Sequence, residues 1–189
     1  MAKGEIIELV IIGGSSGSLD AVLKILPNLN LDFAVPIIIV MHRNVASDSV
    51  LEEVLASRTH LKVVEAEEKE TLSSGYIYIA PPDYHLLIEK EHTISLDYSE
   101  KVNYSRPSID VSFESAADVY RDRVACIILS GANGDGTKGM LYAQSMGSKI
   151  IIQDPAEAIV PFMPEQALMA TNKNNVLSIQ GIISFLNSL

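Results

Sequence analysis

The sequence predicts an α/β fold, a doubly wound and mostly parallel sheet with helices on both faces. Strand-like apolar runs alternate with amphipathic helical segments through most of the chain, which is typical of parallel strands joined by covering helices. The run at residues 36–41 is apolar on both faces, as expected for a central strand with helices on either side. With 189 residues, 48% of them hydrophobic, the chain can bury a full core, and we expect one domain over residues 1–189.

The first third of the chain alternates between strand and helix. After an opening apolar run, Leu19, Val22 and Leu26 recur at helical spacing, and Pro27 ends that helix. The elements expected here are, in order, a strand at 6–12, a helix at 18–26, a strand at 36–41, a helix at 48–55 capped by Ser47 or Asp48, and a strand at 61–66.

The pattern changes after residue 74. Three short strand-like runs, at 76–80, 85–89 and 92–96, are separated by a proline-rich turn and a charged turn, and they predict an antiparallel hairpin excursion around residues 76–96. Ser108 is then the expected N-cap of a long helix. The remaining elements expected are a helix at 109–120, a strand at 124–129, a glycine-rich loop at 130–136, a helix at 137–146, a strand at 149–153, and helices at 164–170 and 179–186.

Composition argues against several classes of protein. The formal net charge is −10, and no cluster of Lys and Arg is available for the counterion release that drives nucleic-acid binding. The chain has no uninterrupted apolar stretch of about 18 residues and no signal peptide, so we expect a cytoplasmic protein without membrane insertion. The single cysteine, Cys126, lies in an apolar run and is expected to be a packed core thiol. The histidines show no close ligand pairing, and we expect neither a metal site nor a cofactor.

Residues 13–17 form a G-x-S-x-G element between the first expected strand and the first expected helix. Small residues on both sides of Ser15 allow a sharp turn that exposes the hydroxyl and leaves backbone N–H groups facing it, which is how a nucleophilic serine is usually mounted. The alternative is that the glycines only shape a tight turn or cradle an anion at the helix N-terminus.

Two further polar residues follow expected strands. In an open parallel sheet, ligands gather outside the carboxyl ends of the strands, so Ser15, His42 and Asp135 are expected to converge although they lie far apart in sequence. Together they would form a nucleophile, a general base and an orienting carboxylate. The alternative interpretation makes His42 a hydrogen-bonded loop residue and Asp135 an ordinary turn aspartate. His85 borders a rigid proline-containing loop, where a structural role is the simpler expectation.

The order and spacing of several segments resemble the catalytic domain of the CheB chemotaxis protein-glutamate methylesterases. The resemblance covers nearly the whole chain and is carried by residues 12–18, 41–42, 78–86, 106–111, 129–136, 153–155 and 163–164. It implies that Ser15 is the nucleophile, His42 the general base and Asp135 the orienting carboxylate. It also implies an oxyanion hole from the backbone N–H groups of Ser16 and Ala132, with Arg106 and Met163 near the substrate cleft.

The substrate implied by this resemblance is a glutamyl methyl ester in the cytoplasmic region of a membrane chemoreceptor, hydrolysed through an acyl-serine; some members also deamidate glutamine. The loop at residues 131–136 departs from the family's G-M-G-N-D-G pattern, because its second glycine has moved relative to the aspartate. The expected first strand stands at the start of the sequence without the family's receiver domain, which fits a stand-alone esterase or an excised fragment. A non-catalytic interaction module on the same fold is the alternative function, and the sequence does not set the oligomeric state.

Overall fold

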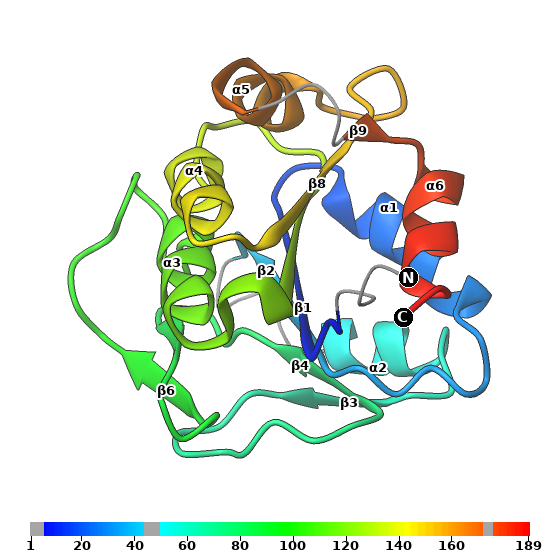
Figure 1. Ribbon diagram of the computed structural model, residues 1–189, viewed down its shortest axis with the longest axis vertical. Helices are drawn as coiled ribbons and strands as arrows, with labels where there is room; N and C mark the ends of the chain where they lie inside the picture. Colours follow the sequence, from blue (N-terminus) through cyan, green and yellow to red (C-terminus); the bar gives the residue numbers. More distant parts are fainter. Residues whose placement is uncertain (1–5, 44–49, 172–175) are drawn as a thin grey trace.

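A seven-stranded sheet forms the centre of the computed structural model, which describes residues 6–43, 50–171 and 176–189 (Figure 1). Among these residues, all neighbouring strands of this sheet pair in parallel. The strands, in their order across the sheet, are β3 (Lys62–Glu65), β4 (Tyr76–Ile79), β2 (Ile37–Met41), β1 (Leu9–Gly14), β7 (Val124–Ile128), β8 (Lys149–Gln153) and β9 (Val176–Leu177). The prediction of a doubly wound parallel sheet is therefore confirmed.

Helices cover both faces of the sheet, and each face has its own hydrophobic core (Figure 1). One face packs against α1 (Ser18–Ile25), α2 (Leu51–Ala56) and α6 (Ile179–Leu186); the other packs against α3 (Ile109–Tyr120), α4 (Thr137–Ser145) and α5 (Phe162–Ala170). Along β2, Ile37 and Ile39 enter the first core, while Ile38 and Val40 enter the second. Both faces of this strand are apolar because each of them packs against helices. Within the described residues, no helix combines the length and the apolar character needed to cross a bilayer.

The antiparallel excursion is confirmed for two strands and corrected for the third. Strands β5 (His85–Ile88) and β6 (Ile94–Asp97) form a separate antiparallel pair. The run that opens the predicted excursion, Tyr76–Ile79, instead joins the main sheet as β4, parallel to β2 and β3. Ile77 and Tyr78 are both buried, in opposite cores, and only a strand covered on both faces can bury consecutive side chains in this way.

Helix boundaries deviate from the predicted ones by a few residues. Helix α1 continues into a short 3₁₀ turn at Leu26–Asn28, which contains the proline expected to end it. Helix α2 begins at Leu51, and its proposed caps, Ser47 and Asp48, lie outside the described residues. Strand β9, only two residues long, was not predicted because so short a strand carries no readable pattern.

Strand β1 lies between β2 and β7, and this position decides which loops meet. The carboxyl ends of these three neighbouring parallel strands lie along one edge of the sheet, where their following loops converge. Helices α1 and α4, which follow β1 and β7, each begin after a glycine in the left-handed conformation, Gly17 (φ 81°) and Gly136 (φ 89°). These glycines allow the chain to turn directly from a strand end into a helix.

Candidate active site

Ser15 occupies the turn that joins β1 to α1. Its backbone N–H donates to Ser130 O at 2.9 Å, and its carbonyl accepts from the Ser18 N–H at 3.0 Å and from Ser18 Oγ at 2.6 Å. A Cβ on Gly14 would lie 2.3 Å from Ser18 Cβ, so only glycine allows the helix to start this close to the strand. Ser15 is held by its backbone on both sides, and its half-buried side chain lines a pocket.

His42 follows the last residue of β2. Its backbone N–H donates to Gly14 O at 3.3 Å, which continues the β1–β2 register beyond the strand end. Its ring reaches across the end of β1 to the loop after β7, where Nε2 lies 2.7 Å from Asp135 Oδ2. The His42 side chain is 13% exposed, and the Asp135 side chain is fully buried. The predicted pairing of His42 with Asp135 is present in the structure.

The Asp135 carboxylate accepts five hydrogen bonds, most of them from the start of α3 and the loop before it. The donors are His42 Nε2 at 2.7 Å, the Ile109 and Asp110 backbone N–H groups at 2.7 and 3.2 Å, Ser108 Oγ at 2.9 Å and Asn103 Nδ2 at 3.2 Å. Burial by itself would raise the pKa of Asp135, but the hydrogen bonds from His42 and Ile109 outweigh burial and hold this pKa below its usual range. Asp135 is therefore an ionised carboxylate that fixes the orientation of His42.

Sequence reasoning placed Ser108 correctly but assigned it a different role. Ser108 is the N-cap of α3, yet its side chain caps no backbone N–H and instead donates to Asp135. Asn103 was not predicted from the sequence, and its amide nitrogen donates to both Asp135 Oδ1 and Asp110 Oδ2. Burial raises the pKa of Asp110, and the nearby Asp135 charge adds to this effect. No sequence pattern identified Asn103, because it lies in an irregular loop and meets Asp135 only through tertiary contact.

Ser15 and His42 line one pocket of about 210 Å³, together with Met41 and Leu51 among others. The structure gives no hydrogen bond between these two described side chains. The second ring nitrogen of His42, Nδ1, instead lies 3.3 Å from Ser105 Oγ and 3.4 Å from the Asn133 amide nitrogen. Because Nε2 faces the ionised Asp135 and carries the proton, Nδ1 is the nitrogen that accepts, and it is the basic atom of this site.

The other predicted site residues flank this arrangement. The backbone N–H groups of Ser16 and Ala132 donate to no other described residue, and both residues are exposed. Free N–H groups beside a nucleophile are what an oxyanion hole requires. Met163 is fully buried, and its side chain packs against Gly131, where a Cβ would lie 2.5 Å from Met163 Cε. Met163 thus supports the glycine-rich loop from behind, and its contact with substrate stays a prediction.

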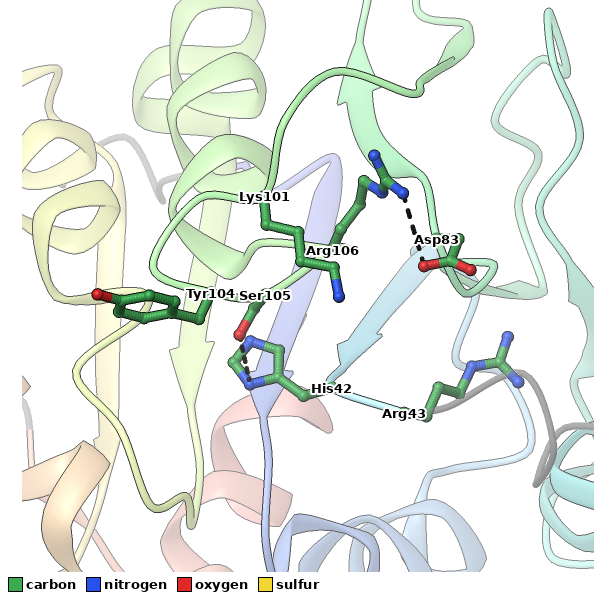
Figure 2. A pocket seen from close by; sticks show the side chains of 7 residues that line it. All are labelled: His42, Arg43, Asp83, Lys101, Tyr104, Ser105 and Arg106. Carbon is green, nitrogen blue, oxygen red and sulfur yellow. Dashed lines mark hydrogen bonds and ion pairs between the residues drawn. The ribbon is translucent and has the colours of Figure 1, made fainter.

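Arg106 lines a second pocket of about 400 Å³, which shares His42 and Arg43 with the first (Figure 2). Its guanidinium donates to Tyr98 O at 3.2 Å and Ser99 O at 2.6 Å, and it lies over the Tyr98 ring. An ion pair with Asp83, at 3.7 Å, adds to these contacts. Arg106 is therefore held in place beside His42.

The remaining candidate residues have structural explanations. His85 is buried, with Nδ1 accepting from the Ser108 N–H at 3.1 Å and Nε2 at 3.0 Å from Glu100 O, so its role is to anchor the loop before α3. Cys126 is buried in β7, and burial raises the pKa of its thiol, which makes it unreactive. In the part of the chain that the structure describes, no three His, Cys, Asp or Glu residues are grouped as a metal site would require.

Comparison with known proteins gives consistent matches over nearly the whole chain. A family model for the CheB methylesterases matches residues 10–186. A protein from Leptospira interrogans is 45% identical over 175 residues, covering 93% of this chain and 91% of that protein. A protein-glutamate methylesterase/protein-glutamine glutaminase from Thermotoga maritima is 34% identical over 85% of this chain, which spans 48% of that protein.

The solved structures include the same fold. The crystal structure of the Thermotoga maritima CheB methylesterase catalytic domain superimposes with a TM-score of 0.91 at 32% sequence identity. The match covers 96% of this chain and 98% of that domain. At this TM-score and coverage, the two domains share the same topology.

Proposed function

The chain belongs to the CheB methylesterase family, and we propose that it hydrolyses glutamyl methyl esters with Ser15 as nucleophile, His42 as general base and Asp135 as orienting carboxylate. The observation that carries the assignment of residues is the 2.7 Å contact between His42 Nε2 and the buried Asp135, in a pocket that Ser15 also lines. A buried carboxylate that is held by four other donors and bonded to an imidazole, in a pocket that a serine also lines, has the geometry of acyl-transfer catalysis.

The first half of the reaction forms an acyl-enzyme. Ser15 Oγ takes the place of Ser105 Oγ at His42 Nδ1, gives up its proton to that nitrogen and attacks the ester carbonyl carbon. The oxyanion that develops accepts hydrogen bonds from the free N–H groups of Ser16 and Ala132. Each such donor typically lowers the activation free energy by about 3 to 4 kcal/mol. Collapse of the tetrahedral intermediate breaks the bond to the methoxy oxygen, which takes the proton from His42 and leaves as methanol.

The second half regenerates the enzyme. Water enters beside His42, transfers a proton to Nδ1 and attacks the acyl carbon, and Ser15 Oγ leaves with that proton as the glutamate side chain is released. Asp135 stabilises the imidazolium in both halves without being protonated itself. The same steps convert a glutamine amide, with ammonia as the leaving group, which corresponds to the second activity in the names of the relatives.

We assign the substrate protein at the level the family supports: a chemoreceptor carrying methylated glutamates in its cytoplasmic region. The pocket at Ser15 is small, which suits a single side chain presented from the surface of a partner rather than a free lipid or a large cofactor. The non-catalytic alternative has no support in the geometry, because a mere scaffold gives no reason to bury an ionised carboxylate behind a histidine.

The structure presents two serines to His42, and one experiment decides which of them attacks. A fluorophosphonate probe is expected to label Ser15 in the wild-type protein, as read by peptide mapping with mass spectrometry. Ser15→Ala should lose labelling and lose methanol release from a γ-methyl glutamyl peptide by about 10³-fold or more. Ser105→Ala is the matched control and should still be labelled at Ser15. Labelling at Ser105, or full turnover by Ser15→Ala, would contradict the assignment.

A further inference from the structure

The 400 Å³ pocket beside His42 is lined by three cationic side chains, Arg43, Lys101 and Arg106, and by one carboxylate, Asp83 (Figure 2). The chain as a whole has a formal net charge of −10, so a cationic concavity runs against its average composition. The group that reacts at Ser15 is a neutral ester, which has no need of several cations. Hydrolysis of the ester therefore does not explain why three cationic side chains line this pocket.

Two of the three cations are fixed by neighbouring groups. Arg43 Nη2 bonds Glu65 Oε2 at 2.6 Å and Ala80 O at 3.0 Å. Arg106 is held by two carbonyls, by the Tyr98 ring and by Asp83, as described above. These contacts hold both guanidinium groups at the pocket wall, and each group is already paired with a carboxylate, Arg43 with Glu65 and Arg106 with Asp83.

Lys101 differs from the two arginines. Its ammonium group makes no hydrogen bond or ion pair with the described residues, and in Figure 2 it extends over the middle of the pocket between Asp83 and His42. Because both guanidinium groups are already paired, the flexible Lys101 ammonium is the lining cation suited to close on a carboxylate that enters the pocket. Ser105 lines this pocket and Ser15 lines the other one, so a ligand bound at Lys101 leaves the Ser15 pocket to the ester.

We propose that this pocket is a subsite for a second carboxylate of the substrate polypeptide, a Glu or Asp side chain within a few residues of the esterified glutamate, with Lys101 as its specificity-determining residue. This inference rests on the proposed function, since it concerns the substrate of the same site. An ester flanked by a carboxylate is then hydrolysed faster than one flanked by an uncharged amide. The subsite makes charge beside the ester a criterion by which the enzyme selects among methylated sites.

Paired peptides test the subsite. Each peptide carries one γ-methyl glutamate and, at one position within four residues on either side, Glu in one member of the pair and Gln in the other. Methanol release gives kcat/KM for each. We expect the wild-type protein to prefer the Glu member by about three- to fivefold at one or more positions, the size typical of a solvent-exposed ion pair. Raising the salt concentration should reduce this ratio, because exposed charges are screened.

Substitutions identify the residue responsible. Lys101→Gln should bring the ratio close to one, and Lys101→Glu should bring it below one. Lys90→Gln removes the same charge from an exposed residue outside the pocket and should keep the wild-type ratio. Methanol release with a ratio of one at every position, or a ratio that Lys101→Glu leaves unchanged, would overturn the subsite while leaving the esterase assignment intact. Release from no peptide by the wild-type protein would overturn the proposed function and the subsite together.

Discussion

At the scale of single residues, the site depends on how Asp135 is buried. A carboxylate removed from water is expensive unless its oxygens are matched by donors, and here the backbone of α3, the Ser108 hydroxyl and the Asn103 amide supply them. The result is a negative charge that is already oriented before substrate arrives. His42 needs no rearrangement to be held by it, whereas Ser15 must still displace Ser105 from Nδ1.

Asp135→Asn is expected to be destabilising as well as inactivating. The amide places an NH₂ group among five donors, and the unpaired donors should cost about 2 kcal/mol of unfolding free energy at pH 7. The pKa of Asp135 is lowered in the folded protein from an ordinary value near 3.8, so its contribution to stability is present above that value and is lost as pH falls through the folded pKa.

Urea denaturation of both proteins from pH 7 down to about pH 3 measures this difference directly. The gap between wild type and Asp135→Asn should narrow below about pH 4, since the unfolded wild-type chain then binds a proton at this carboxyl while the native carboxyl, with its lowered pKa, stays ionised. A gap that stays constant over this range would mean that the pKa of Asp135 is the same in the folded and unfolded states, which would contradict the lowered pKa.

At the scale of elements, helix α3 contacts both Asp135 and helix α4. Its first turn binds Asp135 and also packs tightly against α4, which begins just after the Asp135 loop. Gly139 of α4 makes this contact possible: a Cβ there would lie 2.8 Å from Asp110 O and 2.9 Å from Asp110 Cα. Backbone atoms cannot move aside as a flexible side chain can, so the spacing of the two helices depends on this glycine.

Gly139→Ala should therefore destabilise the protein. In an isolated helix this change would add about 1 kcal/mol of stability, but here overpacking against α3 should cost about 1 to 3 kcal/mol. Gly134→Ala is the matched control, because nothing lies within 4 Å of a Cβ at that position. Thermal denaturation of both variants gives the comparison, and equal stabilities would show that the helix spacing is not fixed by Gly139.

At the scale of the whole molecule, the sheet separates two hydrophobic cores that share its strands. Consecutive residues of β1 alternate between them, Val10 and Ile12 in one, Leu9 and Ile11 in the other. Opening one core would also disturb the other, because both cores are built on the same strands. We therefore expect the described sheet and its helices to unfold as one cooperative unit.

Cys126 reports on this cooperativity. It is the chain's single cysteine and is fully buried in β7, next to the central strand. Its reaction with a disulfide reagent should require global opening, so the free energy derived from labelling rates should match that from urea denaturation, and both should fall with the same slope in urea. A much lower free energy from labelling would reveal a partial opening of the β7 region.

The elements most readily predicted from sequence were those with strong periodicity. The strand at 149–153 and the helix at 179–186 agree with β8 and α6 at both ends, because three consecutive isoleucines between polar residues define the strand and a clear end signal defines the helix. The run at 76–79 was assigned to the wrong sheet. Its local pattern fits a strand of either kind, and only the availability of β2 as a neighbour decided the pairing.

The amino-acid sequence was enough to predict the fold class, the alternation of strands and helices, and Ser15, His42 and Asp135 as candidate site residues, because each of these predictions follows from local patterns and from the rule that parallel strand ends converge. Tertiary structure alone decided what surrounds them. Ser105 at His42 Nδ1, Asn103 between two carboxylates and the cationic pocket at Lys101 all come from the irregular loop before α3. Such a loop has no periodicity to read, since its conformation is set by the partners it meets across the folded chain.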